Sequence, residues 1–89
     1  MRWFRRHDVA AVANDTYIFE LFPAPNWDNA LAVHCLDVVD MGLTQGQNWD
    51  LEALSTACAD HGRHEFLLAA SPEPFVGGCG APVNPVAVF

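Results

Sequence analysis

The chain has 89 residues, enough for one small domain, and a formal charge of −7 at pH 7. It has four arginines and no lysine, which argues against binding to nucleic acid or to an anionic membrane surface. No run approaches the roughly 18 consecutive apolar residues that span a bilayer. Three cysteines without a CxxC spacing favour a reduced, cytoplasmic setting.

The first third of the sequence predicts short elements. Trp3–His7 is typical of the tail of a helix, and the small apolar run Val9–Ala13 suits a strand buried on both faces. Asn14–Thr16 predicts a turn whose side chains bond the backbone. Tyr17–Phe22 mixes aromatic and β-branched residues, so a second extended piece is expected there, ending at Pro23.

Residues Leu31–Met41 are apolar nearly all round, which predicts a buried helix. Asp28 or Asn29 is expected to cap its N-terminus, and Gly42 to end it in the left-handed conformation. The polar residues of the helix are spaced by three, so they form one narrow stripe. The stripe is either a solvent-facing line with a half-buried histidine or a set of groups aimed at a site; its members are His34, Asp37 and Asp40.

A second helix is expected after a connection at Leu43–Gln47. Asn48 is its plausible N-cap, with Asp50 and Glu52 in the first turn, where the helix dipole favours acidic groups. The helix is expected to stop at Gly62. Its apolar face has the spacing i, i+3, i+7 and consists of Leu51, Leu54 and Cys58.

The last third predicts a buried strand at Glu65–Ala70, an irregular proline- and glycine-rich loop at Ser71–Pro85, and a closing strand at Val86–Phe89. Short strands that alternate with helices indicate an α/β protein. The hydrophobic content of 52% is high for so small a domain. We therefore expect part of the apolar surface to meet another chain or a further segment, and we expect a homo-oligomer.

Four stretches occur in an order that resembles the C-terminal half of the cyclase family, the metal-dependent hydrolases that include bacterial kynurenine formamidase. They are VAAVANDTYIFELFP, a strand and D-T turn beside the active site; LAVHCLDVVDMGL, a buried helix with an inward histidine; GQNWDLEAL, a turn into the next helix; and HEFLLAASPEPFVGGCGAPVNPVAVF, a closing signature. The resemblance implies that residues 1–89 are a single partial domain. It would be the C-terminal portion of a swivelling β/β/α fold, with a mixed sheet and two helices.

The family hydrolyses an amide, ester or lactone-like bond at a zinc or manganese centre, and kynurenine formamidase removes formyl from N-formylkynurenine. The resemblance puts the family's inward histidine, a catalytic and metal-binding position, at His34. It puts a glutamate ligand of the family at Gln47. Asp15 and Thr16 are candidates for the substrate pocket; alternatively, they are only turn residues that bond the backbone.

The family motif H-x-G-T-H-x-D-x-P, which carries most of the metal ligands, is absent from this sequence. A catalytic zinc typically takes three protein ligands, so zinc or manganese is not expected to be bound by this chain alone. The first hypothesis is a part of a cyclase-family amidohydrolase that acts on a small molecule once an N-terminal half completes it. The second is a non-catalytic dimerisation or interaction module, and the third is an inert gene fragment.

Overall fold

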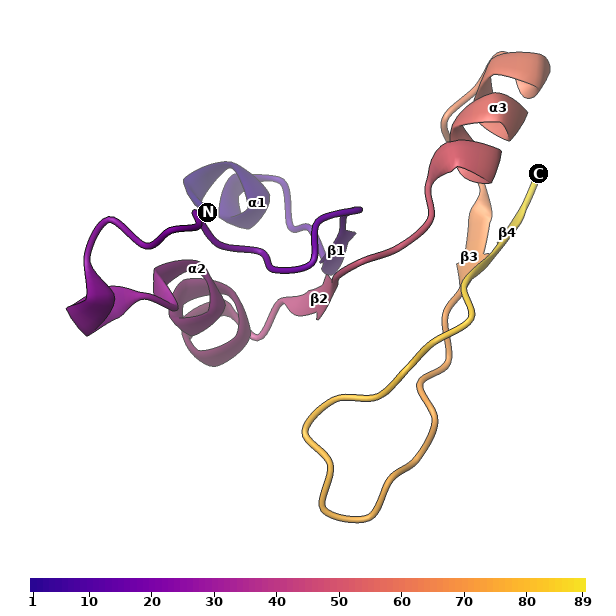
Figure 1. Ribbon diagram of the computed structural model, residues 1–89. Coiled ribbons are helices and arrows are strands. Elements are labelled where there is room, and N and C mark those ends of the chain that lie inside the picture. The colour runs from indigo at the N-terminus through magenta and orange to yellow at the C-terminus, as the bar shows by residue number, and fades with distance from the viewer. The chain divides into compact units, whose positions relative to one another are not determined.

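The computed structural model of the chain describes all 89 residues and divides into two units (Figure 1). Unit 1 comprises Met1–Leu51 and unit 2 comprises Glu52–Phe89. The strands form two separate two-stranded sheets, so the expectation of one mixed sheet with two helices is wrong, although the small mixed α/β class is confirmed. None of the helices has the length and apolar character that a bilayer crossing demands.

Unit 1 contains a parallel pair of strands, β1 (Ala11–Ala13) and β2 (Thr44–Gly46), in which Ala11 lies opposite Thr44 and Ala13 opposite Gly46. The expectation that Leu43–Gln47 is only a connection is therefore wrong. The segment has no strand-like alternation of its own and becomes a strand by pairing with a distant partner. The predicted strand in β1 is confirmed, but Ala11 is exposed, so the strand is not buried on both faces.

A tight contact fixes the end of β2. An added Cβ at Gly46 would lie 2.7 Å from Trp49 Cε2 and 2.9 Å from Ala13 Cβ, so the indole requires glycine there. Asn14 extends the pairing, because its N–H donates to Gly46 O (3.1 Å) and its carbonyl accepts from Trp49 N (3.0 Å).

The helix α1 (Arg2–Arg6) confirms the predicted helical segment near the N-terminus. The predicted turn is also confirmed, since Thr16 N donates to Asn14 Oδ1 at 3.3 Å. Tyr17–Phe22 is irregular instead of extended, because no strand of unit 1 pairs with it. Its rings pack locally: Tyr17 meets Phe22 edge-on at 6.1 Å between centroids, and Phe22 meets Trp27 at 6.4 Å.

The expected long helix is present as α2 (Ala32–His34), which continues as the π-helical segment η2 (Cys35–Met41). It ends at Gly42, whose φ of 65° is the predicted left-handed conformation. The predicted caps are wrong: Asp28 and Asn29 belong to a separate short 3₁₀ helix, η1 (Trp27–Asn29), which is capped by the side chain of Asn26.

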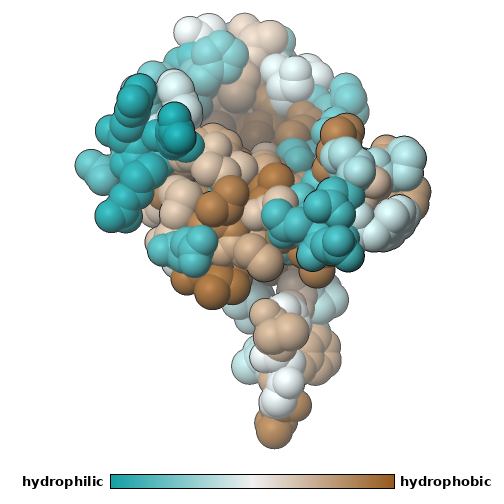
Figure 2. All heavy atoms as spheres, turned by 90° about the vertical axis from the view of Figure 1, so that its left-hand side faces the viewer, coloured by the Kyte–Doolittle hydropathy of each residue, from teal (hydrophilic) through white to brown (hydrophobic).

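Burial along η2 differs from the expected helix that is packed on most sides. Asp37 is fully buried, whereas Val39 is 77% exposed and Leu36 and Val38 are also exposed. A π-helix bonds residue i to i+5, so polar residues spaced by three no longer share one face. The helix therefore turns a carboxylate inward and leaves apolar side chains exposed. The face of the molecule drawn in Figure 2 shows apolar atoms beside hydrophilic ones.

Unit 2 begins with α3 (Glu52–His61), and Gly62 follows it with a φ of 61°, which confirms the predicted stop. Asn48 is not the N-cap. It lies upstream of the helix start with a φ of 57°, whereas an N-cap residue takes an extended conformation. Cys58, on the predicted apolar face, is buried.

The strands of unit 2, β3 (Leu67–Ala69) and β4 (Val86–Val88), pair antiparallel with Leu67 opposite Val88. The predicted closing strand and the irregular loop before it are confirmed. The expected burial of the β3 strand is wrong, because all three of its residues are exposed in this two-stranded ribbon.

An aromatic cluster anchors the end of β4 within unit 2. The ring of Phe89 stacks on His61, with centroids 4.7 Å apart and planes 7° apart, and lies 5.5 Å from the ring of Phe66. The Arg63 guanidinium lies 5.7 Å from the centre of the same ring. These contacts join the C-terminal residue to α3 and to the chain that follows it.

Candidate functional site

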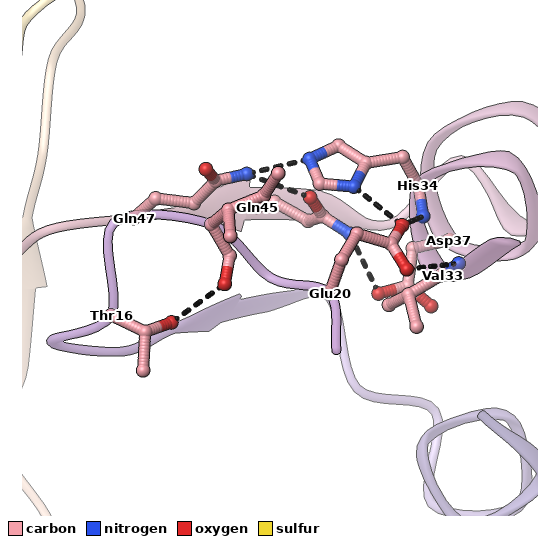
Figure 3. A network of polar contacts seen from close by, with 8 residues as sticks. Thr16, Glu20, Val33, His34, Asp37, Gln45 and Gln47 are labelled. Atoms are coloured by element: carbon pink, nitrogen blue, oxygen red, sulfur yellow. Dashed lines mark hydrogen bonds and ion pairs between the residues drawn. The ribbon is translucent and has the colours of Figure 1, made fainter. Parts of the chain in front are cut away.

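The site in unit 1 is centred on His34, in the last turn of α2, and on the carboxylate of Glu20 (Figure 3). His34 Nδ1 lies 2.8 Å from Glu20 Oε1. The backbone N–H groups of His34 and Val33 donate to Glu20 Oε1 (2.8 Å) and Oε2 (3.1 Å). One carboxylate thus satisfies the first turn of α2 and also fixes the histidine ring.

The carboxylate of Glu20 is almost enclosed, with 6% of its side chain exposed, against 27% for His34. Burial raises the pKa of Glu20. Hydrogen bonds from the His34 ring and from the backbone of His34 and Val33, with the attraction to His34, lower it by more, so the net pKa lies below the ordinary 4.5. At neutral pH Glu20 is therefore an anion that only accepts hydrogen bonds.

This acceptor determines the form of the imidazole. Because Glu20 cannot donate, His34 Nδ1 carries the hydrogen, and the neutral ring keeps its lone pair on Nε2. Gln47 Nε2 lies 2.7 Å from that atom and donates to it. Both ring nitrogens of His34 therefore have partners, one an anion and one a neutral amide.

The amide of Gln47 is itself held by a chain of polar side chains. Gln47 Nε2 also donates to Gln45 Oε1 (3.3 Å), and Gln45 Nε2 donates to Asp37 Oδ2 (2.9 Å). We call Asp37, Gln45 and Gln47 the relay. It runs from a fully buried carboxylate to the lone pair of His34, and the other oxygen of Asp37 has no hydrogen-bond partner.

Two of the residues singled out from the sequence, His34 and Gln47, are adjacent in the structure. The other two lie in the turn after β1. The Thr16 hydroxyl donates to Ile18 O at 2.9 Å, and Asp15 is exposed. The Thr16 carbonyl accepts from Asn48 N (2.8 Å), so this turn borders the residue that follows Gln47.

Sequence reasoning missed Glu20 and Gln45. Glu20 was assigned to an expected strand, although it is the only acidic residue between Asp15 and Asp28, in an otherwise aromatic and apolar run. A lone carboxylate in such a run was a signal that it serves a specific donor. Gln45 carried no signal, because its role depends on β2, which was expected to be a connection.

Zinc or manganese, which the family resemblance implies, does not fit the residues present. No three histidine, cysteine or acidic side chains cluster as a metal site requires. At His34, both oxygens of Glu20 accept N–H groups, and Gln47 directs its nitrogen at the only free lone pair of the ring. As they are arranged here, these side chains do not present the set of ligands that a zinc or manganese ion requires.

Among solved structures, the chain is similar to the crystal structure of a protein described as a novel cyclase. The two are 40% identical with a TM-score of 0.85, and the similarity covers 99% of this chain and 28% of that one. No family model matches the sequence, and neither does any curated protein. The similarity supports the cyclase family, and the chain spans 28% of the length of the protein it matches.

Proposed function

We propose that this chain is part of a cyclase-family amidohydrolase of the kynurenine formamidase kind. Its substrate would be N-formylkynurenine or a related amide, ester or lactone, and His34 would be its catalytic residue. The proposal is carried by the 2.8 Å contact between Glu20 Oε1 and His34 Nδ1. It is supported by the similarity to a cyclase.

A carboxylate on one imidazole nitrogen suits the other nitrogen for proton transfer, because it fixes the tautomer and stabilises the imidazolium that forms. In the proposed reaction, water gives a proton to His34 Nε2 as its oxygen bonds to the carbonyl carbon. The C–N bond then breaks, and the proton passes from Nε2 to the leaving nitrogen. Glu20 stays ionised throughout. Gln47 must release Nε2 before the proton arrives.

The test is hydrolysis by the polypeptide expressed with all coding sequence in its reading frame. The substrates are N-formylkynurenine and a panel of aryl amides, esters and lactones, with zinc or manganese supplied. Replacing the proton carrier by His34→Ala is expected to lower the rate by about 10²–10⁴-fold. Asp40→Ala, an exposed change on the same helix, is the matched control. A folded protein inert to the whole panel contradicts the proposal.

A second candidate is a non-catalytic homologue that dimerises. Leu36, Val38 and Val39 are 45%, 51% and 77% exposed on one short segment, η2, and burying such side chains is favourable. This candidate expects an oligomer that Val39→Asp dissociates, measured by analytical ultracentrifugation, with no turnover on the panel. A monomer at micromolar concentration excludes it.

A further inference from the structure

The orientation of the Gln47 side chain distinguishes this site from a cation-binding one. An amide offers either an oxygen or an N–H group to a neighbour, and here the nitrogen faces His34 Nε2 at 2.7 Å. A metal ion needs the opposite arrangement, with the amide oxygen and the histidine lone pair both turned toward the ion.

The orientation follows from Asp37 outward. The Asp37 carboxylate accepts, so Gln45 turns its NH₂ group toward it at 2.9 Å. The Gln45 oxygen then faces the other way and can only accept, which draws the NH₂ group of Gln47 (3.3 Å). The second hydrogen of that NH₂ group is left for the histidine lone pair. Each step leaves a single orientation for the next side chain.

The charges around His34 also favour a site without a metal ion. With Gln47, the surroundings of His34 hold one anion, Glu20, and one neutral donor, and the neutral ring satisfies both. A glutamate at position 47 would set a second anion against His34 and give Gln45 no donor to accept from. Such a site would require a cation, either a proton or a metal ion, to hold it together.

We infer that Asp37 and Gln45 are positioning residues that turn the Gln47 amide nitrogen onto His34 Nε2, and that this contact caps the lone pair against divalent cations. The His34 side chain is 27% exposed, so solvent reaches it and the cap, not burial, limits its reactivity. The inference concerns hydrogen bonding alone and does not depend on the proposed amidohydrolase activity.

The first experiment measures acylation of each histidine by diethyl pyrocarbonate in the full chain, with mass spectrometric readout. His34 is expected to react more slowly than exposed His64. Gln47→Met and Gln45→Met are expected to speed His34 acylation by about fivefold to tenfold, the change that one net hydrogen bond supports. Thr44→Ala, an exposed change on the same strand, leaves the rate unchanged. If His34 is acylated at the same rate in all variants, the inference that Gln47 caps its lone pair is wrong.

Asp37 tests the positioning role. Asp37→Asn keeps an oxygen that accepts from Gln45 and is expected to retain slow His34 acylation, whereas Asp37→Leu removes the acceptor and is expected to speed it. If Asp37→Leu does not fold, Gln45→Met alone tests the same step. Slow acylation in both folded Gln45→Met and Asp37→Leu contradicts a role for these residues.

Titration with Zn²⁺, followed by ¹⁵N NMR of the histidine side chains, tests the exclusion of cations. The wild-type chain is expected to show no Zn²⁺-dependent shift at His34 Nε2. Gln47→Glu is expected to gain one, because a carboxylate binds a divalent cation and no longer donates a hydrogen bond to Nε2. A saturable shift at His34 in the wild type overturns the inference. Hydrolysis assays play no part in this outcome, so the inference and the proposed function can fail separately.

Discussion

Each of the two units has its own kind of internal contact. In unit 1, residues far apart in the sequence meet through polar groups: Glu20 bonds the first turn of α2, and β1 pairs with β2. In unit 2, a ten-residue helix and a hairpin-like ribbon are joined by aromatic packing around Phe89. All three tryptophans, Trp3, Trp27 and Trp49, lie in unit 1.

This difference shows where a site can form. Unit 1 contains a nearly enclosed carboxylate, a fully buried one and a half-buried histidine, all hydrogen-bonded. Such groups are stable only when their partners are correctly placed, so they determine a specific geometry. In unit 2 the C-terminal residue is held instead by ring contacts with His61 and Phe66. Tryptophan fluorescence monitors unit 1 alone, which allows the two units to be perturbed and read separately.

The largest effect is expected from Gly46→Ala. The new methyl would overlap the Trp49 indole and the Ala13 side chain, so unit 1 should lose about 3 kcal/mol, near the upper end of overpacking costs. Urea unfolding followed by tryptophan fluorescence measures the loss. Thr44→Ala, an exposed change on the same strand, is the control. An unchanged midpoint for Gly46→Ala would show that Trp49 does not pack on β2.

Glu20→Ala should destabilise unit 1 by about 2 kcal/mol, because it leaves two backbone N–H groups and the His34 ring without their charged acceptor. The same fluorescence-detected urea titration measures it. Asp40→Ala, which removes an exposed carboxylate from the same unit, should leave the midpoint in place. If both variants behave alike, the Glu20 contacts contribute nothing to stability.

Phe89→Ala should act on unit 2 alone and cost about 1 kcal/mol, the scale of its aromatic contacts. Amide hydrogen exchange is expected to speed up in β3, β4 and the end of α3, while tryptophan fluorescence stays unchanged. Phe75→Ala removes an exposed phenylalanine from the same unit and provides the control. If hydrogen exchange changes equally in both variants, the stack of Phe89 on His61 does not stabilise unit 2.

The smallest effect is expected from pH. The pKa of Glu20 is lowered in the folded chain, so its stabilising contribution is complete above the ordinary value of 4.5 and is lost as the pH falls through the lowered value. Between pH 7 and 3, wild-type unit 1 should lose more stability than Glu20→Gln does. Parallel pH profiles for the two proteins would contradict the assignment.

Local signals in the sequence predicted several elements well. Gly42 and Gly62 end their helices in the left-handed conformation, and Asn14 forms the expected turn. The closing strand was also predicted, because a short apolar run after a proline-rich loop has few alternatives. The two helix ends and the turn depend on residues within a few positions of one another, whereas the closing strand pairs with β3 across the loop.

Features that depend on distant partners were not predictable in this way. The strand β2 exists through its pairing with β1, and the first turn of α2 is bonded by Glu20 instead of by the adjacent Asp28 or Asn29. The π-helical form of η2 then buried Asp37, which a regular helix of apolar residues would have left on its polar stripe. Periodicity placed His34 on the polar stripe of its helix, and the family resemblance added Gln47 as a second ligand position; in the structure their side chains are 2.7 Å apart.

The hydrogen position on the His34 ring is the measurement that bears most directly on the site. Glu20 at Nδ1 and the Gln47 amide at Nε2 together require the Nδ1–H form, with a bare Nε2. Side-chain ¹⁵N NMR of the folded chain at neutral pH distinguishes the two tautomers. We expect a protonated Nδ1 and an unprotonated Nε2 in the wild type. A hydrogen on Nε2 would mean that Gln47 presents its oxygen, and the relay as described would be wrong.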